Sequence, residues 1–404
     1  MLLNSDLLDQ LAMKTDAKMI FLVMDGLGGM EVAEKGGSEL QVARTPNLDA
    51  LAAAGVCGLF DPVAPGITPG SGPGHFAIFG YHPVVCNIGR GILSACGIDF
   101  PLTPRDVAAR VNFCTIDGAG RIVDRRAGRI DTETNRRLAD RLRAEIKLPQ
   151  GVEFFFETEA DYRGVLILRG DDLSDQIADT DPQRTGVTPL DPKPLDPAAK
   201  RSADLLQSFL TQARQVLAAE PRANMLLLRG YAKLMPYKSL HERFSLSPLA
   251  IAIYPMYRGI ARLLGMEIHP VVHDIPAEFA ALRANYDKYD FFFLHVKDTD
   301  SRGEDGDFDG KVRVLELVDS LIPQLTSLNP DVLVVTGDHS TPSALKGHSW
   351  HPVPVILSAK TVRPDTVTHY DERSCTLGGF GRQPMMNLMG IALAHAGRLQ
   401  KFGA

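Results

Sequence analysis

Three short apolar runs, each ending beside an acid or a glycine, constrain the fold of this 404-residue chain more than any other feature. They are MIFLVM (19–24), FFFLHV (291–296) and VLVVTG (332–337). Each is too short for a core helix and has no polar face, which is typical of a strand buried in a parallel sheet. Helical patterns lie between these runs, at 47–55, 246–265 and 311–325. The alternation predicts an α/β core with a mostly parallel sheet.

The middle of the chain has a different pattern. Strand-like pieces occur at 152–157, 164–170 and 224–230, and one long helix is expected around 198–218. A proline-rich loop without apolar periodicity covers 179–197. We therefore predict a discontinuous core of residues 1–100 and 240–404, interrupted by a smaller inserted α+β domain over residues 101–239.

Composition excludes several classes of protein. Hydrophobic residues make up 45% of the chain and charged residues 23%, which argues against disorder and coiled coil. The net charge of −6 favours neither nucleic-acid nor membrane binding. The N-terminus lacks a signal-peptide pattern, and no apolar run is long enough to span a membrane. Five cysteines without a CxxC pair fit a reducing compartment. We expect a cytoplasmic protein, and a homo-oligomer is left open.

Acids, histidines and one serine follow the predicted strands. Because the carboxyl ends of parallel strands meet at one edge of a sheet, these side chains are expected to gather there. A serine in a Gly/Pro-rich loop, together with acids and imidazoles, could form a site for two cations that ionise its hydroxyl. The candidate residues are Asp25, Ser71, Asp300, Glu304, Asp338, His339 and His348.

Two alternatives accompany this interpretation. Thr68 is a second, weaker candidate for the nucleophile. The stretch from Asp305 to Glu316 matches the EF-hand calcium-loop pattern, although a strand-like run rather than a helix precedes it. We expect a solvated acidic loop there, from which only Asp300 and Glu304 turn inward.

The strings MDGLGG (24–29), TPNLDALAAAG (45–55), TPGSGPGHFAIFGY (68–81), GRG (89–91), TIDGAGRIVDRRAGRI (115–130), HVKDTD (295–300) and DHSTPSALKGHS (338–349) resemble the archaeal type of cofactor-independent phosphoglycerate mutase. That family belongs to the alkaline phosphatase superfamily. The resemblance implies an alkaline-phosphatase-like three-layer α/β/α core and a serine, Ser71, that is transiently phosphorylated.

The resemblance also implies two divalent metal ions, with Mn²⁺ favoured and Co²⁺, Zn²⁺ or Mg²⁺ as alternatives. One ion maps onto Asp25, Ser71, Asp338 and His339, and the other onto Asp300, Glu304 and His348. In the family a histidine is expected where this chain has Glu304, and an acid where it has Ser94. Glutamate shifts the preference towards harder cations. His351 is the alternative ligand to Glu304.

The inserted domain is expected to bind the carboxylate and phosphate of the substrate. Arginine suits such anions because its planar guanidinium makes paired hydrogen bonds. The expected substrate-binding residues are Arg125, Arg126, Arg129, Arg163, Arg229, Arg258 and His75.

The function that follows is a 2,3-bisphosphoglycerate-independent phosphoglycerate mutase, a metal-dependent isomerase that interconverts 3-phosphoglycerate and 2-phosphoglycerate. A metal-dependent phosphomonoesterase, or a phosphotransferase acting on another small phosphorylated acid, is the alternative enzyme. A calcium-binding module built on residues 305–316 is the non-enzymatic alternative.

Overall fold

The computed structural model describes residues 3–86 and 88–403. Its chain divides into two units, one formed by the described residues of 1–87 and 237–404, the other by residues 88–236. The first unit has an eight-stranded sheet. In sheet order its strands are β13 (Gly381–Pro384), β2 (Val56–Asp61), β12 (Val353–Ala359), β11 (Val332–Thr336), β1 (Met19–Met24), β10 (Phe291–Val296), β8 (Pro248–Ala252) and β9 (Glu267–Ile268).

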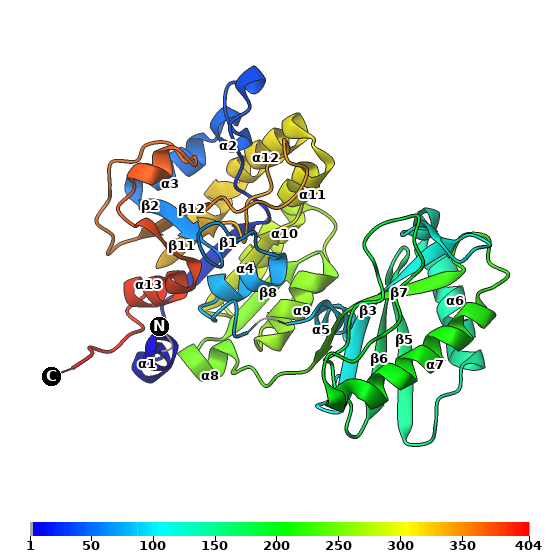
Figure 1. Cartoon of the computed structure of the whole chain (residues 1–404). Helices are drawn as coiled ribbons and strands as arrows, with labels where there is room; N and C mark the ends of the chain where they lie inside the picture. The colour runs from blue at the N-terminus through cyan, green and yellow to red at the C-terminus, as the bar shows by residue number, and fades with distance from the viewer. Residues whose placement is uncertain (1–2, 87, 404) are drawn as a thin grey trace. The chain divides into compact units, whose positions relative to one another are not determined.

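The central strands of this sheet are parallel. Strand β1 pairs in parallel with β10 on one side and β11 on the other, so segments from both ends of the chain lie side by side (Figure 1). Only β12 runs antiparallel to its neighbours, β11 and β2. Every residue of β1, β10 and β11 is buried. The prediction of buried parallel strands at these three runs is confirmed.

Helices cover both faces of this sheet, which confirms the predicted three-layer α/β core. Ile20, Leu22 and Met24 of β1 pack into a core that also contains residues of α3, α10 and α12. On the opposite face, Phe79 at the end of α4 packs edge-on against Phe293 of β10. The helices of this unit are α1 (Leu3–Leu11), α2 (Glu39–Val42), α3 (Pro46–Ala54), α4 (Ser71–Ile78), α8 (Leu240–Phe244), α9 (Pro255–Leu263), α10 (Ile275–Asn285), α11 (Asp298–Asp305), α12 (Phe308–Thr326) and α13 (Leu388–His395).

The single helix predicted over residues 246–265 is wrong. Its first part is the buried strand β8, and helix α9 begins only at Pro255. Proline lacks an N–H and is therefore favoured in the first turn of a helix, where no partner for that N–H exists. The apolar residues of 248–252 pair with β10 instead.

The second unit is built on an antiparallel sheet. Its elements are β3 (Asp106–Ile116), β4 (Ile122–Asp124), β5 (Val152–Ala160), β6 (Arg163–Gly170), β7 (Met225–Lys233), α5 (Arg90–Gly97), α6 (Thr132–Glu145) and α7 (Lys200–Val216). One face of the sheet forms a core with α6 and α7 that includes Val111, Leu138 and Leu206. Helix α5 packs on the sheet so closely that a Cβ on Gly91 would lie 2.1 Å from the carbonyl oxygen of Ala108. This helix, assigned to the core from the sequence, therefore belongs to the second unit.

Among the described residues, no helix combines the length and the apolar character that crossing a membrane requires.

Candidate active site

The acids and histidines predicted from the strand ends gather at one edge of the large sheet. Asp25 directly follows β1, and Asp338 lies two residues after β11. Because β1 and β11 are parallel neighbours, both carboxylates emerge on the same side. Ser71 is the first residue of helix α4 and is 9% exposed. The backbone N–H of Gly26 donates to Asp338 Oδ1 at 3.1 Å, which joins the two strand ends directly.

The first group of potential ligands surrounds His339. Its Nε2 lies 3.3 Å from Asp25 Oδ1, 3.2 Å from Asp338 Oδ2 and 3.3 Å from Ser71 Oγ. The two carboxylates and the imidazole are completely buried. Ligand atoms of Asp25, Asp338 and His339 all lie within 4.8 Å of one another, a spacing that could hold a metal ion.

The second group shares His339 with the first. Ligand atoms of Asp300, His339 and His348 also lie within 4.8 Å of one another. The imidazole rings of His339 and His348 are stacked with centroids 3.6 Å apart, and His348 Nε2 lies 3.7 Å from Asp300 Oδ1. Glu304 Oε1 is 3.9 Å from the same nitrogen, at the exposed margin of this group. His351, the alternative ligand, instead bonds Ser349 Oγ through Nδ1 at 2.9 Å.

The residues present fit divalent cations. Asp25 Oδ1 is buried and accepts no hydrogen bond from any residue that the structure describes. An unpartnered buried oxygen is costly unless a cation or water satisfies it. Mixed carboxylate and imidazole donors suit first-row transition metals such as Mn²⁺ better than Ca²⁺, which prefers an all-oxygen shell.

Sequence reasoning missed Lys297, which lies between the two groups. Its Nζ is 3.0 Å from Asp25 Oδ2, pairs also with Asp300, and donates to the hydroxyl of Tyr257 at 3.2 Å. Burial lowers the pKa of Lys297, but the two carboxylates outweigh it and raise the pKa above its usual value. The signal was available in HVKDTD, where a lysine directly precedes two strand-end acids.

Tyr257 connects this lysine to the serine, since its hydroxyl donates to Ser71 Oγ at 3.5 Å. The pKa of Tyr257 is raised well above its usual value by burial and by the nearby charges of Asp25 and Asp338. The phenol is therefore neutral and remains a hydrogen-bond donor. No local sequence pattern predicts that Tyr257 belongs to the site. The residue lies in helix α9 of the same unit.

Two buried histidines stand behind the carboxylates. His75 Nδ1 lies 3.1 Å from Asp338 Oδ2, and His295 Nε2 lies 3.5 Å from Asp25 Oδ2. Both side chains are fully buried. Burial opposes the charged form of Asp25, but Lys297 and the neighbouring histidines hold its pKa well below the usual range. Asp25 is therefore an anion at neutral pH.

The acidic stretch after β10 is a helix rather than the predicted loop. Residues Asp298–Asp305 form α11, which Gly306 ends with a left-handed backbone conformation. The EF-hand match is wrong, because most of residues 305–316 lie in α12. Asp307 caps that helix by accepting from the N–H of Gly310 at 2.9 Å, and Asp309 pairs with Lys35.

Arginines gather on one face of the sheet in the second unit. Arg110 of β3 and Arg229 of β7 are opposite each other in the antiparallel register. Arg125 makes a two-bond contact with the buried Asp181, at 3.0 and 2.6 Å, and Arg229 lies 3.6 Å from the same carboxylate. Asn112 and Arg163 are paired on β3 and β6. Sequence reasoning missed Arg110 and Asn112, although their alternation with the core residues of β3 marks this face.

The structure does not bring every predicted arginine to this face. Arg126 and Arg129 are exposed in the turn after β4. Arg258, in the first unit, donates through Nη1 to the carbonyl of His269 at 2.7 Å.

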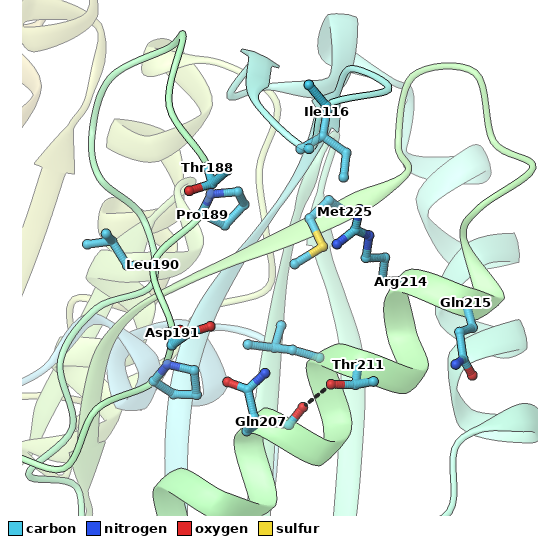
Figure 2. A pocket seen from close by; sticks show the side chains of 14 residues that line it. Ile116, Thr188, Pro189, Leu190, Asp191, Gln207, Thr211, Arg214, Gln215 and Met225 are labelled. Carbon is cyan, nitrogen blue, oxygen red and sulfur yellow. Dashed lines mark hydrogen bonds between the residues drawn. The ribbon is translucent and has the colours of Figure 1, made fainter.

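The second unit also has a hollow of about 460 Å³ between α7 and the loop after Gly186 (Figure 2). Ile116, Leu210 and Met225 contribute apolar surface to it, and Arg214 and Asp191 contribute charges. None of the predicted substrate-binding residues lines this hollow.

Comparisons with known proteins agree on one family. A family model described as 2,3-bisphosphoglycerate-independent phosphoglycerate mutase matches residues 52–223. The chain is 48% identical to a probable enzyme of that name from Thermus thermophilus, over 98% of each chain. It is 44% identical to another from Aquifex aeolicus, over 99% of this chain and all of the relative. The solved cofactor-independent phosphoglycerate mutase from Thermoplasma acidophilum is 30% identical, with a TM-score of 0.71 over 94% of this chain and 100% of that one.

Proposed function

The chain belongs to the family of 2,3-bisphosphoglycerate-independent phosphoglycerate mutases, and on that premise we propose that it interconverts 3-phosphoglycerate and 2-phosphoglycerate through a phosphoserine at Ser71. The supporting observation is the position of Ser71 Oγ, 3.3 Å from the imidazole that both ligand groups share. All five cysteines are free thiols, which fits the cytoplasm as the proposed compartment.

In the first half of the reaction, Ser71 Oγ loses its proton and forms a bond to phosphorus as the bond to the substrate oxygen breaks, and the departing glycerate oxygen takes up a proton. Glycerate then attacks the phosphoserine through its other hydroxyl, and Ser71 is restored. Tyr257 donates a hydrogen bond to Ser71 Oγ and so fixes the hydroxyl in one orientation. A serine held in this way loses less rotational freedom on reaching the transition state.

Two divalent cations, one held by Asp25, Ser71, Asp338 and His339 and the other by Asp300, Glu304 and His348, would stabilise the charge that develops on the serine and phosphate oxygens. His75 and His295 orient the carboxylates of Asp338 and Asp25. His75 is fully buried, so we assign it this orienting role in place of the substrate contact expected from the sequence.

The arginine face of the second unit is proposed to bind the substrate's anionic groups. Asp181 holds the Arg125 guanidinium through both of its oxygens, which leaves the remaining N–H groups directed elsewhere. Arg110 Nε and Arg229 Nε are buried and have no hydrogen-bond partner among the described residues. Such donors are costly to leave unsatisfied and are available to an anion.

The test is an assay with 3-phosphoglycerate and Mn²⁺, without 2,3-bisphosphoglycerate. A mutase forms 2-phosphoglycerate with little free phosphate. Formation of phosphate alone would instead identify a phosphomonoesterase, and neither product would reject both activities.

A further inference from the structure

A fully buried lysine lies beneath the loops that carry the metal-ligand candidates. Lys311, in helix α12, is 0% exposed. Its Nζ donates to the backbone carbonyls of Gly26 at 2.8 Å, Gly28 at 3.2 Å and Thr341 at 2.9 Å. An ammonium group has three N–H donors, and here three carbonyl oxygens accept them.

The same two loops are held by two carboxylates as well, the buried Glu39 and the partly buried Glu372. Glu372 Oε1 accepts from the N–H of Gly29 at 2.7 Å, and Glu39 Oε1 accepts from the N–H of Ser343 at 2.8 Å. Gly29 lies so close to the Glu39 side chain that a Cβ on Gly29 would be 2.1 Å from Glu39 Oε2. One cation and two acids, from three separate segments, thus bind the backbone of the loops at 26–29 and 341–343. Glu372 also accepts a hydrogen bond from the Ser38 hydroxyl through Oε2 at 2.6 Å. We call these three side chains the loop clamp.

The clamped backbone is directly connected to the candidate ligands. Gly26 follows Asp25 and donates its N–H to Asp338. The N–H of Thr341 donates to the carbonyls of Gly26 and Gly28, at 3.2 and 3.0 Å. Its hydroxyl donates to Asp300 Oδ1 at 2.7 Å and lies 3.0 Å from His339 Nδ1. A shift of either loop therefore moves ligands of both groups.

We infer that Lys311, together with Glu39 and Glu372, is a positioning residue that sets the separation of the two metal-ligand groups by holding the backbone of loops 26–29 and 341–343. The inference rests on the proposed two-metal function of these groups. Burying a charge costs desolvation free energy, and an apolar side chain of similar volume would stabilise the core at least as well. Stabilisation of the core alone therefore does not explain a lysine at this position. None of the three clamp residues is among the candidate ligands.

Lys18 offers a matched control. Its Nζ also donates to two backbone carbonyls, those of Tyr286 and Tyr289, each at 2.8 Å. Lys18 precedes β1, so it lies at the strand end opposite to the candidate site. Replacing either lysine by methionine removes an ammonium that binds carbonyls while keeping a side chain of similar length.

The experiment titrates Mn²⁺ into the metal-free full-length wild type, Lys311→Met and Lys18→Met, with free Mn²⁺ followed by electron paramagnetic resonance. Thermal unfolding of each variant is recorded alongside. We expect Lys311→Met to bind Mn²⁺ on the order of 10-fold more weakly, as other changes behind metal ligands do. Lys18→Met should keep the wild-type affinity for Mn²⁺, even if its melting temperature falls by as much as that of Lys311→Met. Equal affinities in the wild type and Lys311→Met, or equal losses in both lysine variants, would overturn the inference.

Glu372→Ala keeps the inference testable if Lys311→Met does not fold. This change removes the acceptor of the Gly29 N–H and leaves Lys311 in place. Weaker Mn²⁺ binding in Glu372→Ala supports the loop clamp, whereas wild-type binding contradicts it. The titration uses no substrate, so its outcome is independent of whether the wild type proves to be a mutase.

Discussion

At the scale of single residues, Ser71 is the position where the proposed chemistry can be removed with the least damage to the fold. Among the described residues, its hydroxyl has hydrogen-bond contacts with only two, His339 at 3.3 Å and Tyr257 at 3.5 Å. We predict that Ser71→Ala lowers the mutase rate by at least about 10³-fold, the scale expected for loss of a nucleophile. The loss of these two long, weak hydrogen bonds should change the free energy of unfolding by about 1–2 kcal/mol. Rate assays and chemical denaturation measure the two effects.

The matched control is Thr68→Ala, three residues earlier on an exposed segment. If Thr68→Ala were inactive and Ser71→Ala retained activity, the nucleophile would have to be reassigned to Thr68.

Glu304 is the residue at which the chain departs from the pattern of the family it resembles. Its carboxylate is 3.9 Å from His348 Nε2 and half-exposed, whereas His351 is held by Ser349. We predict that Glu304→Ala weakens binding of the second Mn²⁺ by about 10-fold or more. Glu304→His should retain part of the affinity, because imidazole is also a Mn²⁺ ligand.

Titration of Mn²⁺ into Glu304→Ala and His351→Ala separates the two candidates. Two bound ions in Glu304→Ala, with only one in His351→Ala, would assign the position to His351.

Site residues were predictable from the sequence only where acids, histidines or serines follow the ends of buried strands. Asp25, Asp338 and His339 lie within three residues of the ends of two parallel buried strands, so topology alone brings them together. Lys311 could not be found in this way. It lies in a helix with an ordinary amphipathic pattern, and its partners are backbone carbonyls rather than a recognisable side-chain motif.

At the scale of secondary-structure elements, the packing of α4 on the strand ends sets the position of Ser71. A Cβ on Gly74 would lie 2.3 Å from the carbonyl oxygen of Asp338, closer than real contacts allow. We predict that Gly74→Ala destabilises the protein by about 1–3 kcal/mol, as overpacking does, and displaces Ser71 from His339. Gly70→Ala is the control, since the nearest atom to its Cβ would be 3.9 Å away. Equal melting temperatures for the two variants would show that this packing is not tight.

Secondary-structure elements were predictable from the sequence where every residue of an apolar run is buried. The expected strands at 19–24 and 291–296 coincide with β1 and β10. Residues 246–265 were misassigned because an apolar strand and an amphipathic helix follow each other with only Ile253 and Tyr254 between them. The helix α11 was missed because six acids in twelve residues are typical of a solvated loop, whereas Asp300 is buried by its contacts with Lys297 and Thr341.

At the scale of the whole molecule, the first unit contains like charges that a cation would neutralise. Asp25, Asp338 and Asp300 are buried close together. We predict that a chelator abolishes activity and lowers the melting temperature, and that Mn²⁺ or Co²⁺ restores both better than Ca²⁺. A metal ion that binds only the folded state stabilises it by about 2.7 kcal/mol when the free ion is present at 100 times its dissociation constant. Hydrogen exchange should lose protection in the first unit after metal removal. Best reactivation by Ca²⁺ would contradict the mixed carboxylate and imidazole site.

The stability of the molecule should also depend on pH through Glu278 in α10. Both of its carboxylate oxygens are buried without a hydrogen-bond partner among the described residues. Burial, with the charges of Asp298 and Asp274 adding to it, raises the pKa of Glu278 to about 9 from an ordinary value of 4.5. Below pH 4.5 the carboxyl is protonated in both the folded and the unfolded state, so its stabilising contribution is complete. Between pH 4.5 and 9 only the unfolded state ionises, and folding becomes less favourable by about 1.4 kcal/mol per pH unit.

Glu278→Gln removes this titration and keeps the shape of the side chain. We predict that its free energy of unfolding nearly equals that of the wild type at pH 5 and exceeds it by several kcal/mol at pH 8, because the wild-type carboxylate must take up a proton on folding and the amide need not. Urea denaturation at the two pH values measures the difference, with the exposed Glu34→Gln as the control. A difference between Glu278→Gln and wild type that stayed constant from pH 5 to pH 8 would mean that Glu278 is already charged in the folded protein. In that case water or a cation must reach its carboxylate, since an isolated buried anion is too costly to persist.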